Sequence, residues 1–567
     1  MTKTLVILPT VAVLVLCVLQ LGISAQQQPC IETKLGQICG TSLEVNGKTI
    51  NRFVGVPYAQ PPVENLRFKP PKPVLKYDTA VDATKPGFSC MQDYSMYGFH
   101  SSIDEWFPPK NETSEDCLFL NIWAPQTKTP ADRLPVLFWI HGGGYFLGSG
   151  YMEQFYDAKA LSAYGNTIVV TINYRLGMLG FAYLGNDDVP GNAGLLDQQM
   201  ALKWVHHHIG SFGGDPGRVT IFGESAGGGS VSAHLGSPES IEYFKNAVVQ
   251  SGTMECPWSH LTPKQAIKHV RQLADHLECP DSQDTKSIYQ CLLGTPAEKL
   301  TISLSPNLNQ PFATPIQGDV NFFKGKPWME NVLRNVDLSE KSVILGATAR
   351  EGALFVPFMH PFQFDFDQVQ DWTVADEQEF TELAREYLKQ SGLEKGIARR
   401  IVKEYANNDA YGTSYIEKLV ELYSDNMIVC KVYELSSVLA NQAITQGVYM
   451  YVYNNTNSKS FYSQAMGATH SSEIHPLFGY PLMQTGWTAS EQQLSREMIE
   501  YWTELAKSGA PTPNDEIWPK FHPESSPNAM ELSTSGPNMI PILTKLTQCS
   551  KWNSDNGDSK KPDKAEL

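Results

Sequence analysis

The chain has 567 residues, of which 42% are hydrophobic and 18% are charged, values that are ordinary for a globular protein. Its formal net charge of −16 at pH 7 argues against nucleic acid or an anionic membrane surface as a partner. Length alone suggests roughly three or four domains. The body contains neither an internal repeat nor a low-complexity linker, so we expect a single domain over residues 26–550.

The first residues have the pattern of a secretory signal. Lys3 precedes an apolar run over 5–21, and Ala25 ends a stretch of small residues that is typical of a cleavage site. The run is short for a membrane span, and no later segment is long and apolar enough to be one. We therefore expect a signal peptide over 1–25, with an uncleaved anchor as the alternative. The polar, charged residues 551–567 predict a disordered tail.

Strand and helix patterns alternate along the first half of the body. Residues 30–56 alternate polar and apolar, as short antiparallel strands do. The continuous apolar runs 134–140 and 168–174 are typical of buried parallel strands. A helical period over 195–205 precedes another buried strand at 218–222. This rhythm predicts βαβ units and a doubly wound, mostly parallel sheet flanked by helices, an α/β fold.

The second half continues the sheet and adds helices to it. We expect strands at 247–250, 341–346 and 447–453, and helices within 260–300, 376–445 and 490–508.

A five-residue motif, Gly223-Glu224-Ser225-Ala226-Gly227, joins the strand at 218–222 to an expected helix. Strand, Gly-x-Ser-x-Gly and helix form the context of a nucleophile elbow, a sharp and strained turn that exposes the serine hydroxyl. The glycines are needed because larger side chains would collide with neighbouring backbone. Ser225 is therefore a candidate nucleophile, and a simple glycine-rich turn is the alternative.

Acyl transfer by a serine also needs donors for the oxyanion. His141-Gly142-Gly143-Gly144 directly follows the strand at 134–140, and three glycines leave bare backbone N–H groups facing a cavity. The N–H of Ala226 is the expected third donor. A flexible surface loop is the alternative for this segment.

An acid and a base must complete such a site. In folds of this kind the order along the chain is Ser, acid, His. Glu351 follows the strand at 341–346 and is the candidate acid, although a solvated turn glutamate is the alternative. The base must be a late histidine. His470 and His475 both fit from the residues alone, with His360 and His522 as weaker candidates.

Several motifs together resemble the type-B carboxylesterase and cholinesterase family of α/β-hydrolases, over about residues 30 to 550. The motifs are 53–59 (FVGVPYA), 114–121 (SEDCLFLN), 141–144 (HGGG), 192–198 (NAGLLDQ), 212–216 (FGGDP) and 223–227 (GESAG). The resemblance implies an α/β-hydrolase fold with helical insertions forming an active-site gorge. It also implies Ser225 as nucleophile, Glu351 as acid, His470 as base, and Gly143, Gly144 and Ala226 as oxyanion donors. No cofactor and no metal is expected.

The cysteines suit the oxidising compartment that a signal peptide predicts. The resemblance implies the disulfides Cys90–Cys117, Cys279–Cys291 and Cys430–Cys549. Cys30 and Cys39 straddle an expected β-hairpin, and their pairing stays open. Cys256 is expected to be free. Sequons predict glycosylation at Asn111 and Asn454.

The choice of ester depends on residues around the nucleophile. The resemblance implies substrate contacts by Trp106, which lies in the Cys90–Cys117 loop, and by Glu224, Trp258, Phe312, Leu354 and Phe355. Trp106 and Glu224 favour a cationic choline ester. The non-aromatic segment before Phe312 and the aliphatic Leu354 favour a broad carboxylesterase, which we expect, with a cholinesterase as the alternative. A non-catalytic adhesion protein is a third alternative, which the intact triad disfavours.

The final residues Lys564-Ala565-Glu566-Leu567 resemble an endoplasmic-reticulum retrieval signal. Secretion and luminal retention both stay open. The expected partner is a small-molecule ester, with no nucleic acid and no stable membrane span. A homo-oligomer is left open.

Overall fold

The computed structural model describes residues 28–95, 97, 100–126, 132–301, 313–391, 393–441 and 445–552. The expected signal peptide, Phe312 and the last four residues lie outside these ranges, as does nearly all of the expected tail. Our statements about them stay predictions.

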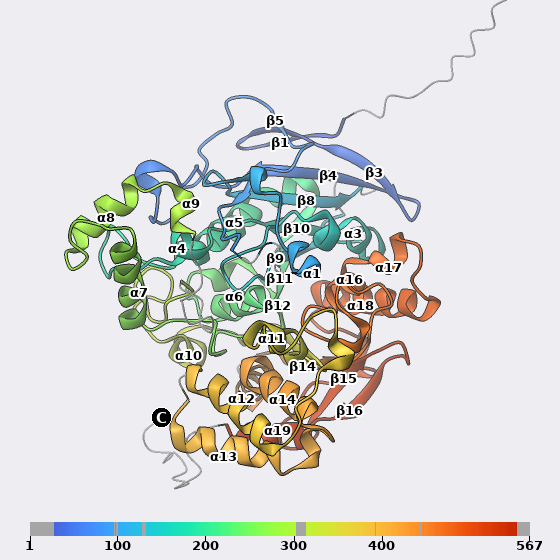
Figure 1. Ribbon diagram of the computed structural model, residues 1–567. Helices are drawn as coiled ribbons and strands as arrows, with labels where there is room; N and C mark the ends of the chain where they lie inside the picture. The colour runs from blue at the N-terminus through green and yellow to red at the C-terminus, as the bar shows by residue number, and fades with distance from the viewer. Residues whose placement is uncertain are drawn as a thin grey trace, which may run out of the picture.

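An 11-stranded mixed sheet forms the centre of the molecule (Figure 1). Its strand order is β16-β15-β14-β13-β12-β11-β9-β10-β8-β4-β3. The middle pairs, from β10–β9 to β14–β15, are parallel, and the pairs toward both edges are antiparallel. The strands are β3 (Thr41–Val45), β4 (Lys48–Pro57), β8 (Phe119–Pro125), β9 (Leu134–Ile140), β10 (Ile168–Ile172), β11 (Gly214–Glu224), β12 (Asn246–Gln250), β13 (Ser342–Thr348), β14 (Gly447–Tyr453), β15 (Asn528–Leu532) and β16 (Asn538–Pro541).

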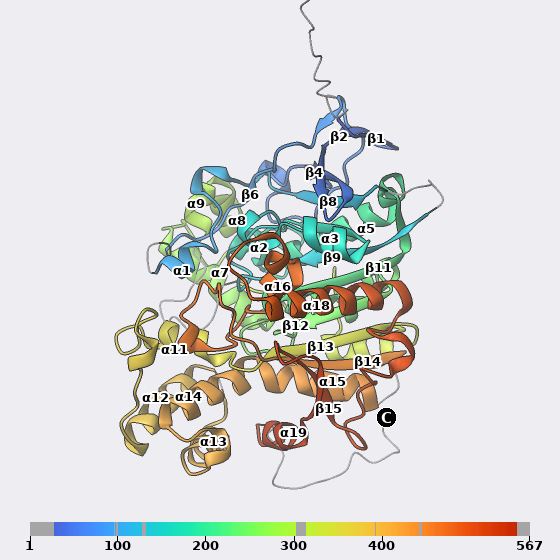
Figure 2. The same ribbon diagram turned by 90° about the vertical axis from the view of Figure 1, so that its right-hand side faces the viewer.

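Each face of the sheet is covered by helices because its central strands are apolar on both sides. On β9, Val136, Phe138 and Ile140 belong to one buried core, and Leu137 and Trp139 belong to the other. The first core is closed by α5 (Ala193–His208), α6 (Ala226–Leu235) and α15 (Cys430–Asn441). The second is closed by α3 (Lys159–Gly165), α16 (Ile474–Phe478) and α18 (Ala489–Ser508), which lie in front of the strands in Figure 2.

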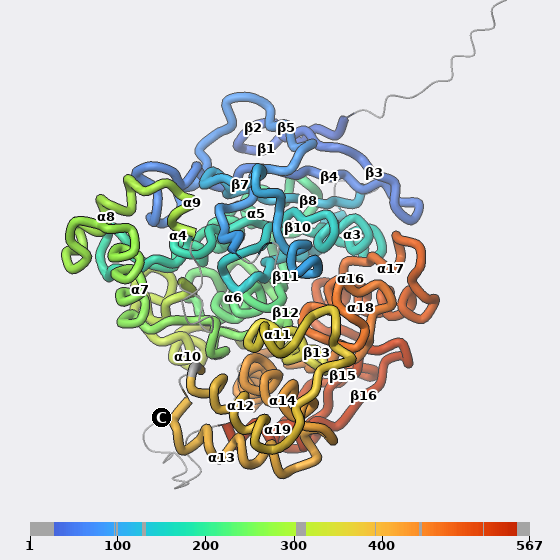
Figure 3. The backbone as a smooth tube through the Cα atoms, viewed as in Figure 1, coloured from blue at the N-terminus to red at the C-terminus, as the bar shows by residue number. Residues whose placement is uncertain are grey.

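Further helices are inserted between the strands and lie beside the sheet (Figure 3). They are α7 (Pro263–His276), α8 (Thr285–Gly294), α9 (Ala297–Leu300), α10 (Trp328–Glu330), α11 (Gly352–Met359), α12 (Glu377–Gln390), α13 (Lys395–Ala406) and α14 (Tyr415–Ser424). A π-helical turn, Asp425–Val429, joins α14 to α15, and α15 contacts the last helix, α19 (Leu543–Ser550). The shorter helices and strands are α1 (Ser101–Asp104), α2 (Glu153–Tyr156), α4 (Gly177–Phe181), α17 (Tyr480–Met483), β1 (Cys30–Thr33), β2 (Gly36–Cys39), β5 (Val81–Asp82), β6 (Ser89–Cys90) and β7 (Thr113–Ser114). The expected α/β fold class is confirmed.

Four disulfides join the described cysteines. The three implied pairs are present: Cys90–Cys117, Cys279–Cys291 and Cys430–Cys549. The pair left open, Cys30–Cys39, is also bonded, because β1 and β2 are antiparallel partners that place these residues opposite each other. Cys256 is free and buried. Asn111 and Asn454 are both exposed. Within the described ranges, none of the helices combines the length and apolar character that a membrane crossing requires.

Candidate active site

The turn at Ser225 has the strained geometry that the motif predicts. Ser225 lies between the last residue of β11 and the first of α6, with φ 59° and ψ −123°. This left-handed conformation is unfavourable for a residue that carries a Cβ. The flanking glycines allow it: a Cβ on Gly227 would lie 2.0 Å from the Ile140 carbonyl oxygen, and one on Gly223 would lie 2.7 Å from the Gly227 backbone.

The glycine segment after β9 passes directly beside this turn. A Cβ on Gly142 would lie 2.7 Å from the Glu224 carbonyl oxygen and 3.1 Å from the Ser225 Cβ. Gly143 and Gly144 have φ values of 101° and 59°, which favour glycine. His141 stacks on Tyr174 and is fully buried, which lowers its pKa to about 4 and keeps it neutral. His141 therefore supports the glycine segment structurally.

The candidate acid and base are in direct contact. Glu351 follows β13, His470 follows β14, and Glu351 Oε2 lies 2.6 Å from His470 Nδ1. The other carboxylate oxygen accepts hydrogen bonds from the Ser251 hydroxyl at 2.6 Å and from the Thr348 N–H at 2.7 Å. Because both side chains are buried, the acid fixes the orientation of the imidazole.

The other late histidines have different partners. His475 Nε2 faces the Gln154 carbonyl oxygen at 3.0 Å, and burial lowers the pKa of His475 to about 4. His360 Nε2 lies 2.8 Å from the Tyr423 hydroxyl. His522 forms an isolated bridge with Ser526. The contact with Glu351 therefore separates His470 from the alternatives that the sequence left open.

Side chains and glycines from these segments line one cavity of about 490 Å³. Among the predicted residues, its wall contains Ser225, His470, Gly143, Gly144, Trp106, Glu224, Trp258 and Phe355. Ala226 is buried at the start of α6. Leu354 is completely buried and is not part of the wall, because it and Phe355 point in different directions from α11. Phe312 lies outside the described residues.

The wall also contains residues that we did not predict. They are Ser95, Gly142, Phe146, Leu147, Gly148, Met152, Phe155, Tyr156, Phe358, Met359, Pro361, Met427, Ser471 and Ile474. Phe146, Leu147 and Ser471 stand close to predicted motifs, and that proximity could have indicated them. Met427 comes from the π-helical turn, where its carbonyl accepts the Trp258 indole N–H at 2.9 Å. The sequence around Met427 contains no motif that could have indicated this residue.

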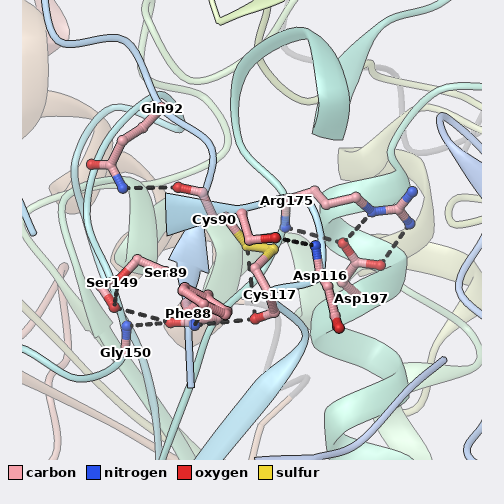
Figure 4. The surroundings of a disulfide bond; sticks show 12 residues. Phe88, Ser89, Cys90, Gln92, Asp116, Cys117, Ser149, Gly150, Arg175 and Asp197 are labelled. Atoms are coloured by element: carbon pink, nitrogen blue, oxygen red, sulfur yellow. Dashed lines mark hydrogen bonds and ion pairs between the residues drawn. A yellow bond between two sulfur atoms is a disulfide. The ribbon is translucent and has the colours of Figure 1, made fainter. Parts of the chain in front are cut away.

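The loop that carries Trp106 is fixed at several points. Its base is the Cys90–Cys117 disulfide, where the Gln92 side-chain amide donates to the Cys90 carbonyl at 3.0 Å (Figure 4). The Gln92 amide oxygen also accepts from the Gly148 N–H at 3.0 Å. Trp106 itself packs edge-on against Tyr462, with ring centroids 6.1 Å apart. The loop is therefore attached to the cavity wall, with Trp106 facing the same space as Ser225.

Buried carboxylates surround the imidazole. Glu224 Oε1 lies 3.1 Å from His470 Nε2, and Glu473 is fully buried nearby. Burial raises the pKa of Glu224 to about 7, although the positive charge of His470 opposes the rise. Burial by itself lowers the pKa of His470, but the charges of Glu224 and Glu351 outweigh it and raise this pKa to about 9. The neighbouring carboxylates therefore stabilise the imidazolium that His470 becomes when it accepts a proton.

A parallel sheet whose strand ends present a serine elbow, an acid and a histidine in that order defines an α/β-hydrolase. The chain belongs to the carboxylesterase family, whose family model matches residues 27–552. The chain is similar to an acetylcholinesterase of Leptinotarsa decemlineata, with 32% identity over 92% of this chain and 85% of that protein. It is 34% identical to acetylcholinesterase 4 of Caenorhabditis briggsae, over 92% and 89% of the two chains. It is 33% identical to the cholinesterase of Mus musculus, over 92% and 86%.

Family membership and these relatives support an enzyme that hydrolyses carboxylic esters. The four disulfides fit passage through the secretory pathway.

Proposed function

We propose that the protein is a serine carboxylesterase with Ser225 as nucleophile, His470 as general base and Glu351 as the acid that orients the base. The main support for this proposal is the 2.6 Å contact between Glu351 Oε2 and His470 Nδ1, beside the cavity that Ser225 and His470 both line. The strained turn at Ser225 supports the same assignment, because strain of this kind is concentrated at functional sites.

The reaction follows from these positions. His470 Nε2 accepts the Ser225 proton while Oγ bonds to the ester carbonyl carbon, and N–H groups of Gly143, Gly144 and Ala226 stabilise the resulting oxyanion. The carbon–oxygen ester bond then breaks, and the alcohol leaves with the proton from Nε2. Water then attacks the acyl-enzyme by the same route, the bond between the acyl carbon and Oγ breaks, and the carboxylic acid leaves as Ser225 is regenerated. Since catalytic hydrogen bonds often tighten only with substrate bound, a small turn of Nε2 from Glu224 toward Ser225 is consistent with this scheme.

A broad acyl and alcohol preference is favoured by the largely apolar side chains around the nucleophile. Phe146, Leu147, Met152, Phe358 and Met427 line the cavity. Such a wall binds neutral groups by excluding water and selects weakly among them, because each added methylene changes binding by only about 1–3 kcal/mol.

A choline ester is the second candidate substrate. Trp106 and Glu224 face the same cavity, and an aromatic face with a nearby carboxylate attracts a quaternary ammonium group. The names of the relatives agree with this candidate.

Two experiments test the assignment. Ser225→Ala should abolish ester hydrolysis and labelling by an organophosphate probe while the far-ultraviolet circular dichroism is unchanged. Near-wild-type turnover by this variant would refute the mechanism, and a folded wild type that the probe does not label would favour the non-catalytic alternative.

Kinetics with acetylcholine and phenyl acetate then separate the two substrates. Trp106→Ala should raise the KM for acetylcholine selectively if choline esters are preferred.

We propose that the protein is either secreted or retained in the lumen of the endoplasmic reticulum. Four disulfides among the described residues and the exposed sequons at Asn111 and Asn454 support either compartment.

A further inference from the structure

Ser471, the residue after His470, has an unusual backbone conformation. Its φ of 68° lies in the left-handed region, where any residue with a Cβ is strained relative to glycine. Strain of this kind persists only where other interactions compensate for it. The side chain of Ser471 lines the catalytic cavity, so the compensating interaction must be sought there.

That interaction is a hydrogen bond to a buried carboxylate. The Ser471 hydroxyl donates to Glu224 Oε1 at 2.9 Å, across a sequence separation of 247 residues. The same oxygen lies 3.1 Å from His470 Nε2. Glu224 is only 2% exposed, so few water molecules can replace the hydroxyl as a donor. One carboxylate oxygen is thus held between a hydroxyl and the ring nitrogen that exchanges the catalytic proton.

We propose that Ser471 is a positioning residue that holds the Glu224 carboxylate against Nε2 of His470. This proposal rests on the proposed function. When His470 takes the proton of Ser225, the imidazolium is flanked by Glu351 at Nδ1 and by Glu224 at Nε2. A carboxylate without its serine donor can rotate into the cavity, and the imidazolium then loses one of its two anionic neighbours.

The titratable groups that face this centre are few. Glu351 and Glu473 approach from the ends of β13 and the start of α16, and Tyr156, Tyr451 and Tyr462 come from α2, β14 and the loop after it. Burial raises the pKa of each of these tyrosines above its ordinary value, so they stay neutral in the working range. A change in the pH profile after substitution at 471 therefore reports on His470 and the carboxylates around it, and the Glu224→Gln background identifies the contribution of Glu224.

Ser471→Ala keeps the Cβ and the strain but removes the donor. We expect kcat for phenyl acetate to fall about three- to tenfold, the range for losing a hydrogen bond of ordinary strength. We expect an unchanged KM, because the hydroxyl that is removed is engaged with Glu224 and the Cβ is kept. The acid limb of kcat/KM should move to lower pH by roughly half a unit to one unit, because the imidazolium is less stabilised. Ser471→Gly relieves the strain and should show the same kinetic changes.

A matched control is available one residue away. Ser472 acts through its backbone, whose N–H donates to Thr469 and whose carbonyl accepts from Asn457 at 2.6 Å. Ser472→Ala should leave both kcat and the pH profile unchanged.

A double substitution decides the question. In a Glu224→Gln background, Ser471→Ala should change kcat less than twofold. The positioning role would be overturned if Ser471→Ala lowered kcat equally with and without Glu224. It would also be overturned if Ser471→Gly had normal kinetics while Ser471→Ala lost activity. A wild type that hydrolyses no ester and takes up no organophosphate would instead refute the proposed function, so the two failures are distinguishable.

Discussion

Replacing Lys545 by Met removes a cation from a buried ionic cluster at the C-terminal helix. Lys545 Nζ lies 2.5 Å from Asp425 Oδ1 and also pairs with Glu421. Asp425 is fully buried in the π-helical turn, and its Oδ2 accepts from the Tyr405 hydroxyl at 2.6 Å. Burial raises the pKa of Asp425 to about 6, a rise that Lys545 limits. Without the cation, Asp425 is a buried charge with no counter-ion, which is strongly unfavourable.

The loss of unfolding free energy in Lys545→Met can be estimated from the protonation of Asp425, whose carboxyl group must stay protonated when the cation is absent. A unit charge at 2.5 Å contributes several kcal/mol at an effective dielectric constant of about 20, so its loss raises the pKa of Asp425 far above the wild-type value. Below pH 6 the carboxyl is protonated in both proteins. Above pH 6 wild type releases the proton and the variant does not, so the destabilisation grows by about 1.4 kcal/mol per pH unit, to about 3 kcal/mol at pH 8.

Thermal unfolding at a fixed scan rate measures this difference. For a domain of this size about 3 kcal/mol corresponds to roughly 3 °C in Tm, beyond any loss common to all pH values. We expect the Tm gap between wild type and Lys545→Met to widen from pH 5.5 to pH 8. Lys551→Met is the control, because Lys551 and Glu404 form a partly exposed pair whose loss should cost less than about 1 kcal/mol at either pH. An equal gap at both pH values would refute the reasoning.

Two further predictions concern the catalytic cavity. Glu224→Gln removes the carboxylate 3.1 Å from His470 Nε2 and should lower the pKa of His470. Because the base must be neutral, the acid limb of kcat/KM should move to lower pH by roughly one to two units, and a limb that stayed or moved up would contradict this prediction. Gly142→Ala places a Cβ 2.7 Å from the Glu224 carbonyl oxygen and 3.1 Å from the Ser225 Cβ. It should lower kcat about 100-fold or more by displacing the oxyanion donors, with circular dichroism as the folding control, and an unchanged kcat would show that the segment tolerates the methyl group.

Elements with a strong local pattern could be predicted from the sequence closely. The expected strands at 134–140 and 447–453 coincide with β9 and β14, because each is a continuous apolar run bounded by polar or turn residues. The strand expected at 218–222 lies within the longer β11, whose first residues, Gly-Asp-Pro-Gly at 214–217, are typical of a turn and gave no strand signal. The turn at Ser225 was predictable because its glycines are required by contacts within the motif itself.

Contacts between distant segments could not be predicted from local patterns. His470 and His475 are five residues apart with similar neighbours, and only the position of Glu351 distinguishes them. The position of Trp106 depends on how the disulfide loop folds back on the cavity, which spacing does not determine. The pairing of Lys545 with Asp425 joins residues 120 positions apart that share no motif.

The strands that carry the proposed catalytic residues lie close together in the sheet but are synthesised one after another. Ser225 follows β11, Glu351 follows β13 and His470 follows β14, and the sheet order places β12 between the first two. A nascent chain that ends before β14 contains the proposed nucleophile, Ser225, but lacks the proposed base, His470. Reactivity toward an organophosphate would thus record the moment at which the segment from β14 onward has docked on the sheet, so the enzyme carries its own reporter of late folding.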